Sequence, residues 1–321
     1  MNLEFLNLKP ETIKIGTRDS QLALWQAKTV QTELENLGYK TELVPVKSEG
    51  DLNLDQPLYE MGITGIFTKT LDIAMLSGKI DIAVHSMKDV PTALPKGIVE
   101  VAVLKRASAN DFLVHKGLDF LEKDGIIATS SLRRRAQWLH KYPHHQTVDL
   151  RGNVNTRLQK LQDNNWNGAI FAEAGLERLG FVKNNNEIKS PSFGGVGEVL
   201  DWMLPAPAQG AMLVVAMKND EYSKKALASL NDENTAACVK IEREFLKVLE
   251  GGCTAPIGAL AEIKNNEIHF KGALFSLDGK QKTMVEKKVP LTEKEELGKR
   301  CAEEVLENGG IKLMRDIKMK M

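Results

Sequence analysis

Residues 13–38 read IKIGTRDSQLALWQAKTVQTELENLG, and this stretch indicates the fold. The β-branched run from Ile13 to Gly16 predicts a strand. After a polar loop over residues 17–20, apolar residues recur at helical spacing until Gly38 ends the pattern; they are Ala23, Ala27, Val30, Leu34 and Leu37. A strand followed by such a helix is the repeating unit of a parallel sheet with crossover helices.

The same alternation continues over the first two hundred residues. Thr41 to Val46 predicts a strand, Ile66 to Leu76 a helix, and Ile80 to Val84 a buried strand. The composition changes between Lys105 and Asp111, and a second series follows. Its predicted elements are a strand over 126–129, a helix over 132–140, a strand over 148–150, a helix around Leu158 and a strand over 169–172.

The remaining sequence predicts a third, smaller unit. Residues 183–197 are rich in Asn, Ser and Gly and are expected to form an exposed loop, after which Met212 to Met217 is expected to return to the first sheet. From about Asn231 we expect a helix, strands over 259–263, 268–275 and 282–289, and a helix over 293–307. The expected organisation is an α/β domain 1 (1–106 and 210–229), an α/β domain 2 (107–209) and a small α+β domain 3 (230–321).

Composition and charge limit the classes of function. The 321 residues contain 43 Lys+Arg and 43 Asp+Glu, so no net charge attracts nucleic acid or a membrane surface. No apolar run approaches the about 20 residues of a membrane span, and residues 1–10 lack the pattern of a secretory signal. Three cysteines without C-x-x-C spacing argue against disulfides and zinc. We expect a cytoplasmic monomer without a bound metal.

A cluster of polar residues follows the predicted strand 80–84. His85, Ser86, Lys88 and Asp89 come directly after it, and ligands bind at the carboxyl ends of strands in open α/β sheets. A solvent-exposed Lys-Asp turn before Pro91 is the more common fate of such a sequence. The position after a buried strand favours a functional site.

Arginines begin two predicted helices of the second series. Ser131 is followed by Arg133 and Arg134, and Arg151 and Arg157 surround the next junction. Cations in the first turn oppose the helix dipole, whereas a bound carboxylate or phosphate would compensate them. The alternative is a basic patch facing solvent or nucleic acid, and the lack of interleaved aromatic residues weakens the nucleic-acid version.

Cys253 lies in the sequence Glu250-Gly251-Gly252-Cys253-Thr254-Ala255-Pro256. A lone cysteine is usually a small buried hydrophobe, but the two glycines leave room for an attached group. Cys238 and Cys301 lie within helical patterns and are interpreted as packing residues.

Taken together, these segments closely resemble the porphobilinogen deaminase (hydroxymethylbilane synthase) family of tetrapyrrole biosynthesis, over nearly the whole chain. The motifs that carry the resemblance are Ile15 to Gln26, His85 to Pro91, Thr129 to Arg134, Leu150 to Val154, Ala208 to Ala211 and Glu250 to Cys253. The resemblance implies two domains similar to periplasmic binding proteins, a small third domain, and a dipyrromethane cofactor linked through a thioether to Cys253. Four porphobilinogens would be joined head to tail with loss of ammonia, and the linear tetrapyrrole then released by hydrolysis.

The resemblance also assigns site residues. Asp89 would be the catalytic carboxylate, near the pyrrole N–H, where it stabilises positive charge and relays protons. The substrate contacts carried over are Arg18, Ser20, Arg157 and Arg178. The cofactor contacts are Lys69, Ser86, Lys88, Asp89, Thr129, Ser130, Ser131, Arg133, Arg134, Arg151, Gly152 and Gln209, together with Cys253.

Three positions depart from the family pattern. Thr64 stands in a glycine-rich loop that typically carries a basic residue, Asn155 replaces a usual glycine, and Glu173 places a carboxylate where the family is generally apolar. Because a carboxylate facing the site would repel a polyanion, we expect Glu173 to point away or to pair with an arginine such as Arg178.

Two other functions compete with this assignment. A two-lobed anion-binding module would use the same arginines to hold a polycarboxylate without turning it over, although it needs no third domain. A cysteine-dependent acyl or sulfur transferase would instead need a reactive thiol at Cys253 and a nearby base.

Overall fold

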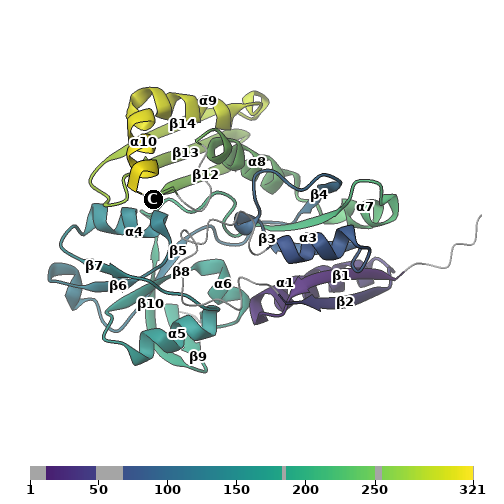
Figure 1. Cartoon of the computed structure of the whole chain (residues 1–321), viewed down its shortest axis with the longest axis horizontal. Coiled ribbons are helices and arrows are strands. Elements are labelled where there is room, and N and C mark those ends of the chain that lie inside the picture. Colours follow the sequence, from purple (N-terminus) through teal and green to yellow (C-terminus); the bar gives the residue numbers. More distant parts are fainter. Residues whose placement is uncertain (1–11, 48–67, 183–185, 250–254, 321) are drawn as a thin grey trace, which may run out of the picture.

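The computed structural model describes residues 12–47, 68–182, 186–249 and 255–320 of the chain. The described residues form three sheets, each with its own helices (Figure 1). We call the units built on these sheets domains 1, 2 and 3. This arrangement confirms the predicted class, two α/β domains followed by a small α+β domain. The boundaries expected at residues 106, 209 and 229 stay predictions.

Domain 1 has a five-stranded sheet that is parallel except for one strand. In spatial order its strands are β2 (Thr41–Val46), β1 (Ile13–Arg18), β3 (Ile82–Ser86), β11 (Met212–Met217) and β4 (Ile98–Val103). Strand β11 runs antiparallel to both of its neighbours, which confirms the expected return of the chain. Helices α1 (Gln21–Asn36) and α7 (Glu221–Leu227) pack on one face, and α3 (Lys69–Leu76) packs on the other. The buried stripe Ala27, Val30 and Leu34 explains why α1 lies against β1.

Domain 2 has a six-stranded mixed sheet. Its strands in spatial order are β7 (Gln146–Val148), β6 (Ile126–Ala128), β8 (Gly168–Ala172), β5 (Asp111–His115), β10 (Phe193–Leu200) and β9 (Glu187–Ser190). Helices α5 (Val154–Asp163) and α6 (Glu173–Arg178) cover one face, and α4 (Leu132–Lys141) covers the other.

Domain 3 has a three-stranded antiparallel sheet. Its strands are β12 (Ile257–Lys264), β13 (Glu267–Phe275) and β14 (Lys282–Pro290), covered by α8 (Glu233–Val248), α9 (Leu297–Val305) and α10 (Ile311–Lys320). Cys238 and Cys301 are buried in this core, which confirms their interpretation as packing residues.

Two crossover segments connect domains 1 and 2, one between β4 and β5 and the other between β10 and β11. They contact each other where the Ala107 N–H donates to the Gly210 carbonyl at 3.3 Å. Gly210 has φ +86°, and a Cβ there would lie 2.4 Å from the Ser108 carbonyl oxygen. Only glycine satisfies both conditions without displacing the adjacent crossover.

Domain 3 is attached to these crossovers through the buried carboxylate of Glu242 on α8. Arg106 donates to both of its oxygens, at 2.6 and 3.1 Å, and the N–H groups of Ala208 and Ala261 donate at 2.6 and 2.8 Å. One side chain therefore joins both crossovers to the third sheet.

The structure differs from the sequence predictions in several elements. The expected loop over 183–197 contains β9 and most of β10, which form an edge hairpin paired to β5. Glycines lowered its predicted strand propensity, but Phe193 and Leu200 are buried and anchor the hairpin. Strands β4 and β5 had no predicted counterpart. The helix predicted over 293–307 is observed as α9, which ends at Val305; Gly309, at φ +102°, separates it from α10, which had no predicted counterpart.

Candidate functional site

The first part of the candidate site lies at the carboxyl end of β3. The short 3-10 helix η1 (Met87–Asp89) follows this strand, with Met87 buried and Lys88 and Asp89 half-buried. Before it, Ser86 Oγ accepts a hydrogen bond from Gln26 Nε2 of α1 at 2.9 Å. The buried Met87 therefore fixes the turn that carries both charged residues.

Lys88 lies in a strongly cationic environment. Burial and the positive charge of Arg134 lower the pKa of Lys88 to about 8, against the opposing effect of Asp89 and Asp111. Its Nζ donates to Gln209 Oε1 at 3.2 Å. An anion bound beside Lys88 would raise this pKa again, because a nearby negative charge favours the charged ammonium.

Gln209 connects the two α/β domains. Its side chain is fully buried, and Nε2 donates to the Ala109 carbonyl at 2.7 Å and to Asp111 Oδ1 at 3.0 Å. Since its Oε1 accepts from Lys88, one amide joins the cation of domain 1 to the first residue of β5 in domain 2.

Arg133 and Arg134 both bind the carboxylate of Asp111. Arg133 Nη1 and Nη2 donate to it at 2.5 and 3.2 Å, and Arg134 Nε donates at 2.8 Å. All three side chains are buried. Burial alone would raise the pKa of Asp111, but the two guanidinium groups hold it well below its usual range. Two cations share one carboxylate, so the trio keeps a net positive charge.

The hydroxyl groups before α4 support the backbone of two junctions. Ser131 Oγ accepts from the Arg134 N–H at 3.4 Å and caps α4, and Thr129 Oγ1 accepts from the Ser131 N–H at 3.2 Å. Ser130 Oγ accepts from the Leu150 N–H at 2.7 Å, which ties this junction to the one before α5. Hydrogen-bonding N-caps of this kind are typical of Ser and Thr.

The junction between β7 and α5 adds two further arginines. Gly152 has φ +111° and follows the buried Arg151, and its carbonyl accepts from Arg157 Nε at 2.7 Å. Burial and the charges of Arg134 and Arg151 lower the pKa of Arg157 to about 10, while Asp89 opposes this. The charges on domains 1 and 2 therefore act on one another across the site.

Arg18 and Ser20 approach from the end of β1. Ser20 caps α1 by accepting from the Ala23 N–H at 3.3 Å. Burial and the charge of Arg18 lower the pKa of His85 to about 4, so the His85 imidazole is neutral at pH 7. The same Arg18 charge contributes to the lowered pKa of Arg157.

Two predicted site residues lie apart from this cluster. Lys69 is exposed in the first turn of α3. Arg178 Nη2 donates to the Gly210 carbonyl at 2.7 Å, and its guanidinium lies 5.6 Å from the ring centre of Trp25 on α1. Arg178 therefore contacts the second crossover and domain 1.

Glu173 is paired, although not with the expected arginine. Its Oε2 accepts from Ser108 Oγ at 2.5 Å and from Asn110 Nδ2 at 3.2 Å, so the carboxylate is held against the first crossover. Asn155 Nδ2 donates to Gln21 Oε1 on α1 at 2.7 Å. Cys253 and Thr64 lie outside the described residues.

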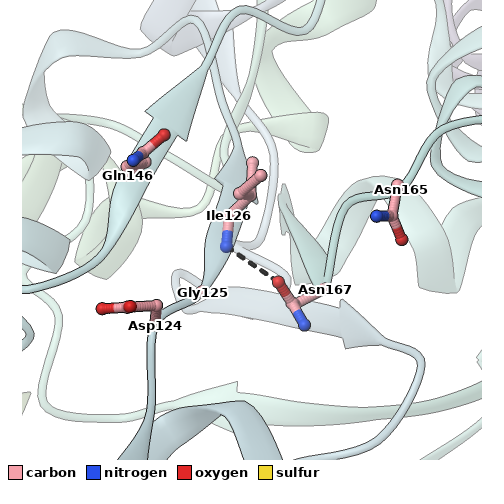
Figure 2. A pocket seen from close by; sticks show the side chains of 6 residues that line it. All are labelled: Asp124, Gly125, Ile126, Gln146, Asn165 and Asn167. Atoms are coloured by element: carbon pink, nitrogen blue, oxygen red, sulfur yellow. Dashed lines mark hydrogen bonds between the residues drawn. The ribbon is translucent and has the colours of Figure 1, made fainter.

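The hollow drawn in Figure 2 lies away from the predicted residues. It is lined by Asp124, Gly125, Ile126, Gln146, Asn165 and Asn167, and Ile126 begins β6. It therefore opens at the amino end of that strand, opposite the junction that carries Thr129. In the described ranges, no group of His, Cys, Asp or Glu could hold a metal ion, and no helix there combines the length and apolarity of a membrane span.

Sequence reasoning missed the polar residues that organise the site from within. Asp111 opens the apolar run Asp111-Phe112-Leu113-Val114, and a charge beginning such a strand is a usable signal. Gln26 lies on the buried stripe of α1 beside Ala27, where a polar residue needs a partner. Glu242 had no local signal, because its partners are distant in the sequence.

The comparisons with known proteins agree with the motifs. The family model described as "Porphobilinogen deaminase, dipyromethane cofactor binding domain" matches residues 13–225, and "Porphobilinogen deaminase, C-terminal domain" matches residues 236–307. Among solved structures, the methionine binding protein MetQ superposes with a TM-score of 0.43 and 15% identity over 76% of this chain and 97% of MetQ.

Curated relatives match along almost their entire length. The porphobilinogen deaminase of Geobacter metallireducens is 40% identical over 314 residues, which is 97% of this chain and 96% of the relative. That of Carboxydothermus hydrogenoformans is 40% identical over 316 residues, covering 97% and 98%. The two domain models and these relatives show that the chain belongs to the porphobilinogen deaminase family.

Proposed function

We propose that the protein is a hydroxymethylbilane synthase, a transferase of tetrapyrrole biosynthesis. It would join four porphobilinogen molecules head to tail, with loss of ammonia at each coupling, on a dipyrromethane primer attached to Cys253. It would then release the linear tetrapyrrole by hydrolysis. Membership of the family supports the overall reaction, and the geometry of the charged residues supports the assignment of roles.

One observation carries the proposal: cations from both α/β domains act on one another around the half-buried carboxylate of Asp89. Lys88 and Arg157 both have lowered pKa values, and Asp89 acts electrostatically on both. Clustered cations of this kind are costly unless an anion binds them. A chain of pyrroles that carry acetate and propionate groups is such an anion.

The cofactor fits the chemistry of these side chains. Arg18, Arg134, Arg151 and Arg157, together with Lys88, would hold the carboxylates of a bound dipyrromethane and of the growing chain. When bound, the dipyrromethane supplies the pyrrole carbon to which the first substrate is joined. A fixed attachment at Cys253 would make each coupling a near-intramolecular step.

Asp89 has the environment expected of the catalytic carboxylate. Its charge acts on Lys88, Arg134 and Arg157, and a carboxylate at this position would stabilise the positive charge that develops on the substrate. The same carboxylate can accept and return a proton at a pyrrole nitrogen. Arg133, by contrast, is buried against Asp111 and the Leu204 carbonyl, so we assign it to holding Arg134 and α4 in place.

The first experiment is the intact mass of the purified, denatured protein. We expect the wild type to exceed the 35.6 kDa of the chain by two linked pyrrole units, and the Cys253→Ser variant to show the bare mass. The matched control is Cys301→Ala, which alters a packing cysteine and should retain the added mass. A wild-type protein that stays at the bare mass after incubation with porphobilinogen contradicts the proposal and favours an anion-binding module.

The second experiment replaces Asp89 with Asn. We expect this variant to lose nearly all turnover of porphobilinogen while its unfolding midpoint stays close to that of the wild type, because the amide preserves shape but not charge. Asp201→Asn, at an exposed position, is the control and should turn over normally. Normal turnover by Asp89→Asn would remove Asp89 from its proposed role.

A further inference from the structure

A tight turn of domain 3 is inserted against helix α4 of domain 2. The turn, residues 276–281, connects β13 to β14, and α4 lies directly beneath domain 3 in Figure 1. The carbonyl oxygen of Gly279 lies 2.7 Å from His140 Nδ1, and the rings of His140 and Phe275 meet edge to face at 5.7 Å. Ala136, Ala273 and Phe275 form a small buried cluster at the same seam.

Hydrogen bonds within the turn hold its shape. Ser276 Oγ donates to Asp278 Oδ1 at 2.6 Å and accepts from the Gln281 N–H at 2.9 Å. Gly279 has φ +72°, and a Cβ on it would lie 2.4 Å from the Ala136 carbonyl oxygen and 2.7 Å from the His140 nitrogen. The backbone of the turn therefore lies so close to the backbone of α4 that only glycine, which has no side chain, fits at position 279.

The helix that receives this turn also carries the predicted anion-binding arginines. Arg133 and Arg134 lie in its first turn, and Ala136 and His140 lie one and two turns later. A helix of ten residues is about 15 Å long and essentially rigid over that length. The position of the turn on α4 thus fixes domain 3 relative to Arg134.

The other attachments of domain 3 lie at the crossovers and on domain 1. Glu242 binds Arg106 and the Ala208 N–H, and the Ala259 N–H donates to the Pro205 carbonyl at 3.0 Å. Arg243 of α8 donates to the carbonyl oxygens of Val90 and Pro91 of domain 1 at 2.9 and 2.7 Å. The contact between residues 276–281 and α4 instead attaches domain 3 to a helix of domain 2, and it opposes movement of domain 3 relative to that helix.

We propose that the turn over residues 276–281 is a positioning element, in which Gly279 and His140 hold the cofactor-bearing domain in register with the arginines of α4. Gly279 and His140 are positioning residues and contact no substrate. The inference deepens the proposed function and rests on it, because the register matters only if Cys253 carries the primer. Loss of the register would misplace the growing chain, and misplacement by about 1 Å can cost a hundredfold in rate.

The test compares Gly279→Ala with Gly78→Ala. The two glycines have nearly equal φ, +72° and +69°, but a Cβ at Gly78 meets nothing within 4 Å, so the control carries the same backbone strain without the clash. Hydrogen exchange of the holoenzyme should rise in residues 136–141 and 276–281 for Gly279→Ala only. We expect its kcat for porphobilinogen to fall about tenfold or more, with KM unchanged because the substrate-binding cations remain.

A second pair of variants guards against misfolding of the first. His140→Ala removes the donor to the Gly279 carbonyl and should lower kcat, whereas His140→Asn places an N–H near the Nδ1 position and should restore most of it. The proposal is overturned if Gly279→Ala leaves exchange unchanged, if exchange rises without a fall in kcat, or if His140→Asn fails to exceed His140→Ala. If the wild type carries no added mass and shows no turnover, the proposed function is wrong. Hydrogen exchange would then still show whether residues 276–281 are docked on α4.

Discussion

At the scale of single residues, the charge state of Lys88 is the most sensitive feature of the site. The Lys88 pKa of about 8 means that the ammonium is charged below this pH and neutral above it. Gln209 accepts its hydrogen bond, but burial and neighbouring cations leave the protonation of Lys88 dependent on what is bound. A bound carboxylate raises this pKa again, so substrate and Lys88 stabilise each other.

This gives a prediction for the pH dependence of catalysis. We expect kcat/KM for porphobilinogen to fall as the pH rises above about 8, because Lys88 then loses its proton. In Lys88→Arg the guanidinium stays charged, so the alkaline limb should move to higher pH even if the maximum rate is lower. Lys79→Arg, at an exposed position outside the predicted site, is the control. An alkaline limb that is identical in wild type and Lys88→Arg would assign it to another group.

At the scale of elements, the buried trio of Asp111, Arg133 and Arg134 joins strand β5 to helix α4. The helix would otherwise begin with cations that oppose its dipole. The carboxylate of Asp111 compensates them from the neighbouring strand, and Arg134 Nη1 also donates to the Ile170 carbonyl of β8 at 2.9 Å. The first turn of α4 is therefore held from within the sheet.

Asp111→Asn should consequently destabilise domain 2. The change leaves two buried guanidinium groups without their carboxylate, a loss expected to be about 3–5 kcal/mol, measured as a lower midpoint of urea unfolding at pH 7. Asp149→Asn is the matched control, because Asp149 binds Arg135 of the same helix at the surface and should cost less than about 1 kcal/mol.

The pH dependence of stability provides a second test of Asp111, Arg133 and Arg134. Because the folded-state pKa of Asp111 lies below the ordinary value of 3.8, its stabilisation is present above that value and is lost as the pH falls. The difference in urea midpoint between the wild type and Asp111→Asn should therefore shrink as the pH is lowered below 3.8. Equal midpoints of the two proteins at pH 7 would contradict the role of this carboxylate.

At the scale of the whole molecule, the side chain of Glu242 joins the two crossover segments to domain 3. It is fully buried and accepts from Arg106 and Ala208 of the crossovers and from Ala261 of β12. A buried carboxylate with four donors is well compensated, but each donor loses its partner if the charge is removed.

We therefore expect Glu242→Gln to loosen domain 3 and to lower stability by about 3–5 kcal/mol. The measurement is the urea midpoint together with hydrogen exchange in α8 and β12, which should rise before exchange in the first sheet. Glu221→Gln, which alters an exposed pair with Lys224, is the control. Unchanged exchange in domain 3 would show that other contacts hold it.

How much of the fold could be predicted depended on whether the signal was local. Helices α1 and α4 and strands β1, β2 and β6 follow local apolar patterns, so they were predicted to within a few residues, and α5 was predicted by its position around Leu158. Strands β9 and β10 were missed, because Gly194, Gly195 and Gly197 indicate a loop. Residues 193–200 form strand β10 because they pair with β5. Such pairing depends on a distant segment and cannot be predicted from the local sequence.

By itself, the sequence determined the two α/β series, the third domain, and the motifs that place polar residues after β3, β6 and β7. These follow from periodicity and junction residues that are close in the chain. Only the tertiary structure decided that Arg133 and Arg134 share Asp111, that Gln209 joins Lys88 to Asp111, and that Gly279 docks on α4. The physical reason is that a buried charge or donor is satisfied by whichever partner the fold brings within hydrogen-bonding distance, and these partners lie between 22 and 139 residues away in the chain.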